Sequence, residues 1–433
     1  MAKKLLDDCF LHDKDRMRHD DAIALLKSRI STVTATSRVS VADATGRVLA
    51  APAVAERPVP AHTNSAVDGY AVAAAHYDQA QGTRFAIAAR AAAGRPLQTA
   101  PASDTAVRIF TGAMMPEGFD TVAMQEDCTL EGGSVEGDGA AGGFVTIPPG
   151  LKAGATVRKA GEDVTAGTKL FEKGSLLRPQ DAAALASIGL TDVLCHDQLK
   201  VAIVSTGDEV IRPGSRPLGP GEVFDANAPM LMALSRSAGV DVKDLGVWPD
   251  DASEIEQRLM QAVTSFDVIL TSGGASRGDE DHMLTVLDKL GKLHMWQLAV
   301  KPGRPVMFGQ IGDTVMIGLP GNPVAVFVCF LMYVYPTLRR LGGGAWPEPR
   351  RFMLPAAFDM PKRKMGRREF LRGWIEMRDG AMVVCKFARD GSGLISGLRA
   401  AQGLIDIGED VTHIAAGDLV RFIPFSEFGI LDQ

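Results

Sequence analysis

The sequence predicts a multi-domain α/β protein built around one doubly wound α/β domain, with smaller β-containing units before and after it. Between residues 195 and 342, unbroken apolar runs such as Val201-Ala-Ile-Val-Ser alternate with helical patterns. Apolar strands interleaved with helices are typical of a parallel sheet that is covered on both faces. Elsewhere, short apolar runs are separated by Gly, Pro and Asp, which is typical of small β-sheets.

The elements follow in chain order. Residues 18–30 carry apolar side chains at helical spacing and predict a short helix. Strand-like runs begin at residue 57, and the Gly342-Gly-Gly stretch marks a boundary before further short strands. We therefore expect a discontinuous connector and dimerisation domain at 1–56 and 150–194, a β-rich domain at 57–149, the α/β domain at 195–342 and a C-terminal all-β module at 343–433.

Composition and charge exclude several classes of protein. The 46 Lys+Arg and 52 Asp+Glu residues give a formal net charge of −6, which argues against a nucleic-acid partner. Charged residues interrupt the N-terminus before any secretory core, so we expect a cytoplasmic protein. The most apolar run, 324–338, is shorter than a membrane span and contains Pro336, so we expect a buried helix and no membrane partner. The five cysteines form no C-x-x-C pair, which argues against a disulfide framework or zinc knuckle.

Three loops that directly follow strands of the α/β domain carry suitable side chains for ligand binding. Ligands of open α/β sheets bind beyond the carboxyl ends of the strands. The candidate binding residues are Ser205, Thr206, Gly207, Asp208 and Glu209, then Ser272, Gly273, Gly274, Ser276, Asp279 and Asp281, then Pro320, Gly321 and Asn322. Taken alone, the first loop fits a generic capped turn equally well, and the third is more simply a helix start.

Two cations precede the third loop. Lys301 and Arg304 flank a Pro-Gly turn and are suited to clamp phosphate oxygens. Glycine turns let backbone N–H groups approach a phosphate, and the acids can hold a hard divalent cation. Together they predict a phosphorylated or pyrophosphate ligand bridged by Mg²⁺. The first βα unit carries no Gly-x-Gly-x-x-Gly and the chain no Walker A loop, while glycosidase chemistry would leave both cations without a role.

Polar turns outside the α/β domain are further candidates. Asp68 lies in Asn64-Ser-Ala-Val-Asp-Gly-Tyr-Ala, and Thr111 lies in Ile109-Phe-Thr-Gly-Ala. Each pattern fits an ordinary β-turn equally well. Glu162 and Asp163 similarly place two carboxylates beside a turn.

These motifs, in this order, resemble the molybdopterin molybdenumtransferases, a family that includes the C-terminal part of gephyrin. The ordered match runs from about residue 20 to the C-terminus. The matching motifs are the Asn64, Ile109 and Ser205 motifs above, Gly161-Glu-Asp, Ser272-Gly-Gly-Ala-Ser-Arg-Gly-Asp-Glu-Asp, Lys301-Pro-Gly-Arg-Pro and Leu319-Pro-Gly-Asn-Pro.

The resemblance implies a reaction and an assembly. Molybdenum from molybdate is inserted into adenylylated molybdopterin with release of AMP, assisted by Mg²⁺. The enzyme is an elongated homodimer of four-domain subunits, with a molybdopterin-binding-like α/β domain. Its site lies between that domain and the β-rich domain of the partner subunit. A molybdopterin adenylyltransferase and a recipient molybdoenzyme are further expected partners.

The resemblance also assigns roles to individual residues. Relatives often carry Lys where Gln297 and Arg304 stand, which implies a weaker oxyanion contact at 297 and a changed cation geometry at 304. The residues implied in catalysis are Asp68, Thr111, Asp163, Glu209, Asp250, Asp281 and Lys301, and those implied as metal ligands are Asp279, Asp281 and Glu209.

Two other functions compete with this one. Molybdopterin adenylyltransferase shares the α/β fold and its Gly-Gly and Pro-Gly loops, but the domains at 1–194 and 344–433 argue against it. The second alternative is a scaffold that binds a partner peptide through the C-terminal β module, as gephyrin does with receptor loops.

Overall fold

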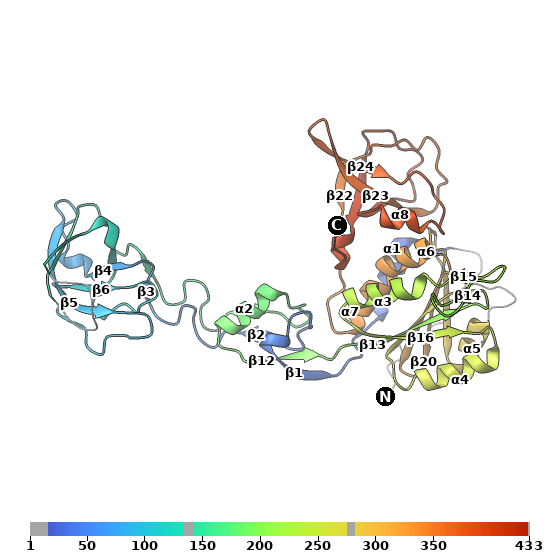
Figure 1. Ribbon diagram of the computed structural model, residues 1–433, viewed down its shortest axis with the longest axis horizontal. Coiled ribbons are helices and arrows are strands. Elements are labelled where there is room, and N and C mark those ends of the chain that lie inside the picture. Colours follow the sequence, from blue (N-terminus) through green and yellow to red (C-terminus); the bar gives the residue numbers. More distant parts are fainter. Residues whose placement is uncertain (1–15, 133–141, 275–281, 432–433) are drawn as a thin grey trace.

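The computed structural model describes residues 16–132, 142–274 and 282–431. The molecule is elongated, with the β-rich domain at one end and the α/β domain with the C-terminal module at the other (Figure 1). Two-stranded ribbons and one helix lie between the two ends. The predicted fold class, a multi-domain α/β protein with additional β-rich units, is confirmed.

A six-stranded sheet forms the centre of the α/β domain, in the order β16-β13-β17-β21-β20-β18. The first four strands are parallel, whereas β20 and β18 pair antiparallel at one edge. The strands are β13 (Lys200–Thr206), β16 (Asp241–Trp248), β17 (Val268–Ser272), β18 (Lys292–Gln297), β20 (Pro305–Ile311) and β21 (Thr314–Leu319).

Helices cover both faces of this sheet. Val201 and Ile203 of β13 pack into one buried cluster, and Ala202 and Val204 pack into another. Because successive side chains of a strand point to opposite faces, both sets must be apolar, which explains the unbroken apolar run. The first cluster includes α3 (Asn227–Ser237) and α6 (Pro323–Cys329), and the second includes α4 (Ala252–Ala262) and α5 (His282–Leu290).

The most apolar stretch of the chain is the buried helix that the sequence predicts, but it is longer than expected. The helix runs from Pro323 to Leu341, and 89% of its most apolar 18-residue window is buried inside the protein. Pro336 does not end it. A π-helical segment at Phe330–Val334 precedes α7 (Tyr335–Leu341), and Pro336 is the second residue of α7. The local change in helical winding accommodates a proline that would interrupt a regular α-helix.

The β-rich domain contains a second six-stranded sheet, in the order β7-β4-β6-β5-β9-β8. Gly69 is required at its position, because a Cβ atom there would lie 1.9 Å from the carbonyl oxygen of Ala123 on the neighbouring strand. The strands are β4 (Gly69–Val72), β5 (Thr83–Ala91), β6 (Ala106–Ile109), β7 (Thr121–Met124), β8 (Thr129–Glu131) and β9 (Phe144–Ile147).

Two separated stretches of chain pair with each other in the connector. The paired strands are β1 (Thr36–Ser40) with β12 (Asp192–His196) and β2 (Ala53–Val54) with β11 (Lys169–Phe171), beside α2 (Pro179–Ser187). β3 (Asn64–Ser65) pairs with β10 (Val157–Arg158) in the same way.

Helix α1 (His19–Arg29) differs from the expectation that placed residues 1–56 in the connector. Its buried side chains Ala22 and Leu26 pack into the core of the α/β domain together with Ile30. The helix therefore belongs to that domain by packing. Its apolar face packs against core residues that are more than 150 positions away in the sequence. Helical spacing predicts the helix but not its packing partner.

The C-terminal module is a β-sheet in the order β19-β23-β25-β26-β22, with β24 beside β23. Its first strand, β19 (Val300–Lys301), comes from the α/β domain and pairs parallel to β23. The other elements are β22 (Phe352–Pro355), β23 (Arg368–Arg378), β24 (Ala381–Lys386), α8 (Ile395–Arg399), β25 (Gly403–Ile407) and β26 (Leu419–Pro424); the short pair β14 (Val210–Ile211) and β15 (Val223–Phe224) belongs to the α/β domain.

Candidate active site at the carboxyl edge of the sheet

The register of the parallel strands brings the predicted loops to one edge of the α/β sheet. Thr206 is opposite Trp248, and Ser205 is opposite Ser272. Ser272 is in turn opposite Leu319. The loops that follow β13, β16, β17 and β21 therefore leave the sheet side by side, as the rule for open α/β sheets requires.

A cavity of about 470 Å³ opens at this edge. It brings together seven sequence-predicted residues from three loops, and it also includes two residues of the C-terminal module, Asp390 and Ser392, that sequence reasoning missed. The predicted residues that line it are Gly273, Gly274, Lys301, Arg304, Pro320, Gly321 and Asn322. The sequence-predicted Ser205, Thr206, Gly207, Asp208 and Ser272 lie at the same edge but do not line the cavity.

Two glycines are required by close packing around this cavity. Gly273 has a φ of +91°, and a Cβ atom there would lie 2.7 Å from the Thr206 hydroxyl oxygen. Gly303 has a φ of +98°, and a Cβ atom there would lie 2.2 Å from the Cys329 sulfur. A side chain at either position would be strained and would clash. These contacts fix the Gly-Gly loop against β13 and the Lys301–Arg304 turn against helix α6.

The two predicted cations are each held by a partner. The Lys301 ammonium lies 3.8 Å from a carboxylate oxygen of Glu369, a buried residue of β23. The Arg304 guanidinium donates a hydrogen bond of 3.2 Å to the Gln297 side-chain oxygen. Both cations remain at the cavity wall, so their charge is available to an anionic ligand.

A buried polar network behind the cavity was not predicted from the sequence. Asp225 accepts hydrogen bonds from the Ser205 hydroxyl at 2.5 Å and from the backbone N–H groups of Asn227 and Ala228 at 3.0 Å each, and it forms an ion pair with Arg212. The only sequence signal is an Asp two residues before the start of a helix, a common capping pattern.

Asn227 extends this network to the other two loops. Its side-chain nitrogen donates to the Ser272 hydroxyl at 2.8 Å and to the Gly321 carbonyl at 2.7 Å. One residue thus joins the ends of β17 and β21, while Asp225 holds the end of β13. Buried hydrogen-bond networks of this kind fix the relative positions of the loops that they connect.

Acidic residues gather at the end of β16. The Asp250 backbone N–H donates to the Asp208 carboxylate at 3.2 Å. Burial, followed by the negative charges of Asp208 and Glu209, raises the pKa of Asp250. A cation bound beside these carboxylates would relieve the repulsion. Within the described residues, no three His, Cys, Asp or Glu side chains are close enough together to hold a metal ion. Ser276, Asp279 and Asp281 lie outside the residues that the structure describes.

The remaining predicted residues belong to other parts of the chain. Both the backbone N–H and the hydroxyl of Thr111 donate to one Asp68 oxygen at 2.7 Å, and these two bonds, the backbone one first, lower the pKa of Asp68. Asp163 is exposed near the connector. Asp68 and Thr111 lie in the β-rich domain, at the opposite end of the subunit from the cavity (Figure 1).

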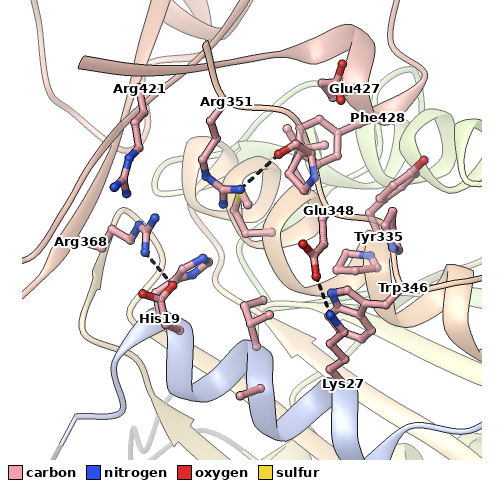
Figure 2. A pocket seen from close by; sticks show the side chains of 18 residues that line it. His19, Lys27, Tyr335, Trp346, Glu348, Arg351, Arg368, Arg421, Glu427 and Phe428 are labelled. Carbon is pink, nitrogen blue, oxygen red and sulfur yellow. Dashed lines mark hydrogen bonds and ion pairs between the residues drawn. The ribbon is translucent and has the colours of Figure 1, made fainter. Parts of the chain in front are cut away.

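A second cavity, of about 690 Å³, lies between α1, α7 and the C-terminal module. Arg351, Arg368 and Arg421 are on one side of it, and Tyr335 and Trp346 are on the other (Figure 2). None of the sequence-predicted site residues that the structure describes lines this cavity. The cavity at the carboxyl edge of the sheet is therefore the candidate active site.

Three family models match successive parts of the chain. Residues 17–189 match the MoeA N-terminal region (domain I and II), residues 202–340 a probable molybdopterin binding domain, and residues 354–425 the MoeA C-terminal region (domain IV). A molybdopterin molybdenumtransferase of Haemophilus influenzae is 37% identical over 371 residues, which cover 85% of this chain and 88% of that protein. This chain belongs to the molybdopterin molybdenumtransferase family.

Two further similar proteins are a gephyrin and a protein of known structure. Gephyrin of Dictyostelium discoideum is 28% identical over 351 residues, which cover 73% of this chain and 48% of gephyrin. The crystal structure of a molybdopterin biosynthesis MoeA protein from Pyrococcus horikoshii is 28% identical, with a TM-score of 0.78 over 95% of this chain and all of that one. That structure thus shares this chain's fold over nearly its full length.

Proposed function

We propose that this chain inserts molybdenum from molybdate into adenylylated molybdopterin, with release of AMP and with the assistance of Mg²⁺. The observation that carries the proposal is the cavity of about 470 Å³, in which glycine turns and two cations from separate loops meet at the carboxyl edge of the sheet. Backbone N–H groups and cations at such an edge bind phosphate oxygens.

Individual residues of the cavity have distinct tasks in this reaction. Lys301 and Arg304 neutralise the pyrophosphate and the molybdate oxyanion, so that two negatively charged substrates can approach each other. The Gly273–Gly274 turn binds phosphate oxygens through backbone N–H groups. Water cleaves the phosphoanhydride bond, so that AMP leaves and the pterin keeps its own phosphate. The two dithiolene thiols then bind molybdenum in place of one molybdate oxygen, which leaves as water with their two protons. The network of Asp225 and Asn227 keeps the three loops in register during these steps.

Mg²⁺ would supply charge neutralisation at the leaving phosphate. Glu209, with Asp208 and Asp250 beside it, provides the hard carboxylate oxygens that Mg²⁺ prefers. Because the described residues hold no complete set of three such ligands, the further ligands would come from Asp279 and Asp281 or from substrate oxygens. This division is typical of Mg²⁺, which is often held by one or two carboxylates and by phosphate.

The position of Asp68 and Thr111 supports a homodimeric site. In one subunit they are at the far end from the cavity, so they can contribute only to the cavity of another copy (Figure 1). The proposed assembly is therefore a cytoplasmic homodimer in which the β-rich domain of each subunit completes the site of its partner. A molybdopterin adenylyltransferase would supply the substrate, and a molybdoenzyme would receive the product.

The proposal is tested by incubating the purified protein with adenylylated molybdopterin, molybdate and MgCl₂ and measuring AMP. We expect AMP release that requires molybdate and is abolished by EDTA. If no molybdate-dependent AMP appears, the proposed function is wrong. The adenylyltransferase alternative predicts instead that ATP and unmodified molybdopterin yield the adenylylated product, and a second incubation with these substrates separates the two.

A further inference from the structure

Strand β23 of the C-terminal module directly adjoins the cation turn of the candidate active site. β19, which ends at Lys301, pairs parallel to β23 with Lys301 opposite Glu369. The adjacent residue, Arg368, faces the second cavity and forms an ion pair with Asp20 (Figure 2). Successive residues of a strand point to opposite faces, so β23 directs Glu369 to the active-site side.

Glu369 is buried and divides its two oxygens between different partners. Its side chain is only 3% exposed. One oxygen accepts a hydrogen bond of 2.9 Å from Arg367 and lies 3.7 Å from Arg363. The other oxygen lies 3.8 Å from the Lys301 ammonium. A buried carboxylate needs compensating charge, and the arginines supply it. Lys301 is therefore not the only cation that compensates the buried Glu369 carboxylate.

The distance between Lys301 and Glu369 shows how the lysine is held. At 3.8 Å the contact is an ion pair but is longer than a hydrogen bond of 2.7–3.2 Å. The Lys301 side chain is 35% exposed and lines the cavity. Asp390 also lines the cavity: partial burial raises the pKa of Asp390, but the hydrogen bond from Lys386 and the charges of Lys386 and Lys301 keep it below its usual value. The Lys301 ammonium is thus paired with Glu369 at a distance that leaves its N–H groups able to bind an anion.

We propose that Glu369 is a positioning residue for Lys301, holding its ammonium at the cavity wall so that it binds the anionic substrate. The C-terminal module is in this way part of the active site of its own subunit. The inference rests on the proposed function for the identity of the anion. The contact that carries it, a buried carboxylate in register with the lysine, does not depend on that identity.

A purely structural role for Glu369, as the anchor of Arg363 and Arg367, gives a different prediction. In that case substitution of Glu369 lowers activity to the same extent whether or not Lys301 is present. A positioning role requires that the effect disappear when the lysine is removed, because contacting residues are energetically coupled. Glu376 provides the control, since it lies on the same strand and pairs with the exposed Arg378.

The test is a double-mutant cycle with molybdate-dependent AMP release by the full-length protein. We expect Glu369→Gln to lower kcat/KM about tenfold in the wild-type background and to leave it unchanged in the Lys301→Met background. Glu369→Asp keeps the charge beside the arginines but withdraws the carboxylate from Lys301, and it should show the same coupling if Glu369→Gln does not fold. Glu376→Gln should behave as wild type. Equal losses in both backgrounds would overturn the proposal.

A second measurement does not require the reaction. Acylation of amines by an activated ester, followed by mass spectrometry, reports how readily the Lys301 amine is deprotonated and reached by the reagent in the substrate-free protein. Loss of its partner in Glu369→Gln should raise Lys301 labelling about threefold relative to Lys289, which keeps its own ion pair with Glu256. Unchanged labelling contradicts the positioning role. If wild type releases no AMP but the labelling rises, the proposed function is wrong and the contact between Glu369 and Lys301 stands.

Discussion

Arg304 donates a hydrogen bond of 3.2 Å to the side-chain oxygen of Gln297. The two positions at which the family resemblance leads us to expect lysine are therefore in contact with each other. Gln297 offers a neutral acceptor that orients the guanidinium, which a lysine at 297 could not do. Gln297 thus orients Arg304 at the cavity wall.

This contact predicts coupling between the two positions. Gln297→Leu removes the acceptor and should raise KM for the adenylylated substrate about fivefold, the size expected for a partly exposed charged hydrogen bond. Arg304→Lys should have a similar effect, because an ammonium cannot keep the same geometry. The double variant should be no worse than either single one. Additive losses would show that the two side chains act independently.

The Asp68–Thr111 contact predicts a low pKa for the Asp68 carboxyl group that depends on the Thr111 hydroxyl. The hydrogen bonds from Thr111 lower the pKa of Asp68, so the carboxylate stays charged below the ordinary value of 3.8. The contribution of Asp68 to the stability of the folded protein is present above pH 3.8 and is lost as the pH falls through the lowered pKa. Thr111→Val keeps the backbone bond and removes the hydroxyl, so it should move the pKa of Asp68 upward. NMR titration of the Asp68 carboxyl carbon measures this, and an unchanged pKa contradicts the assignment.

We predict that the Asp250 carboxylate lowers the stability of the folded protein and assists cation binding. Its raised pKa means that its contribution to stability is complete below pH 3.8 and is lost as the pH rises through the raised value. Asp250→Asn should therefore raise the Tm at pH 7 in EDTA while lowering Mg²⁺-dependent activity. Asp251→Asn is the control, because Asn can keep the cap that Asp251 provides to Glu254 of α4. A lower Tm in Asp250→Asn would contradict the repulsion inferred at this end of β16.

The buried network predicts a large loss of stability at Asp225. Its side chain is 2% exposed and serves a hydroxyl, two backbone N–H groups and Arg212. Asp225→Asn should lower the free energy of unfolding by about 3 kcal/mol in urea, because the half-buried Arg212 loses one of its two charged partners and buried hydrogen bonds are broken. Glu172→Gln, which removes a carboxylate from the exposed ion pair with Lys169, should leave the free energy of unfolding within error. An effect of equal size in both variants would show that burial of Asp225 is unimportant.

The sequence predicts those parts of the site that are contiguous along the chain. The loops at Gly273 and Pro320 each follow a predicted strand, so strand patterns and the edge rule are enough to bring them together, and Lys301 is associated with them because it shortly precedes the third loop. Asp225 and Glu369 could not be found in this way. They meet Ser205 and Lys301 through register and through pairing across domains, over separations of 20 and 68 residues, and short-range periodicity contains no information about such contacts.

The same lack of long-range information explains where the fold differs from the sequence prediction. The helix near residue 324 is recognisable from its apolar residues, but the π-helical segment that lets it continue through Pro336 depends on tertiary packing. Helix α1 is predicted correctly as a helix, whereas its packing partner in the α/β domain is set by the three-dimensional arrangement.

The central claim is that the transferase site combines the sheet-edge cavity of one subunit with the β-rich domain of its partner. Complementation tests it most directly. Asp68→Asn and Lys301→Ala should each retain only a residual molybdate-dependent AMP release. When the two are mixed and subunits exchange, half of the dimers are mixed, and each mixed dimer has one intact site. Activity should return to about a quarter of the wild-type value. A mixture that stays at the residual level of the single variants, although subunit exchange is demonstrated, would contradict the shared site.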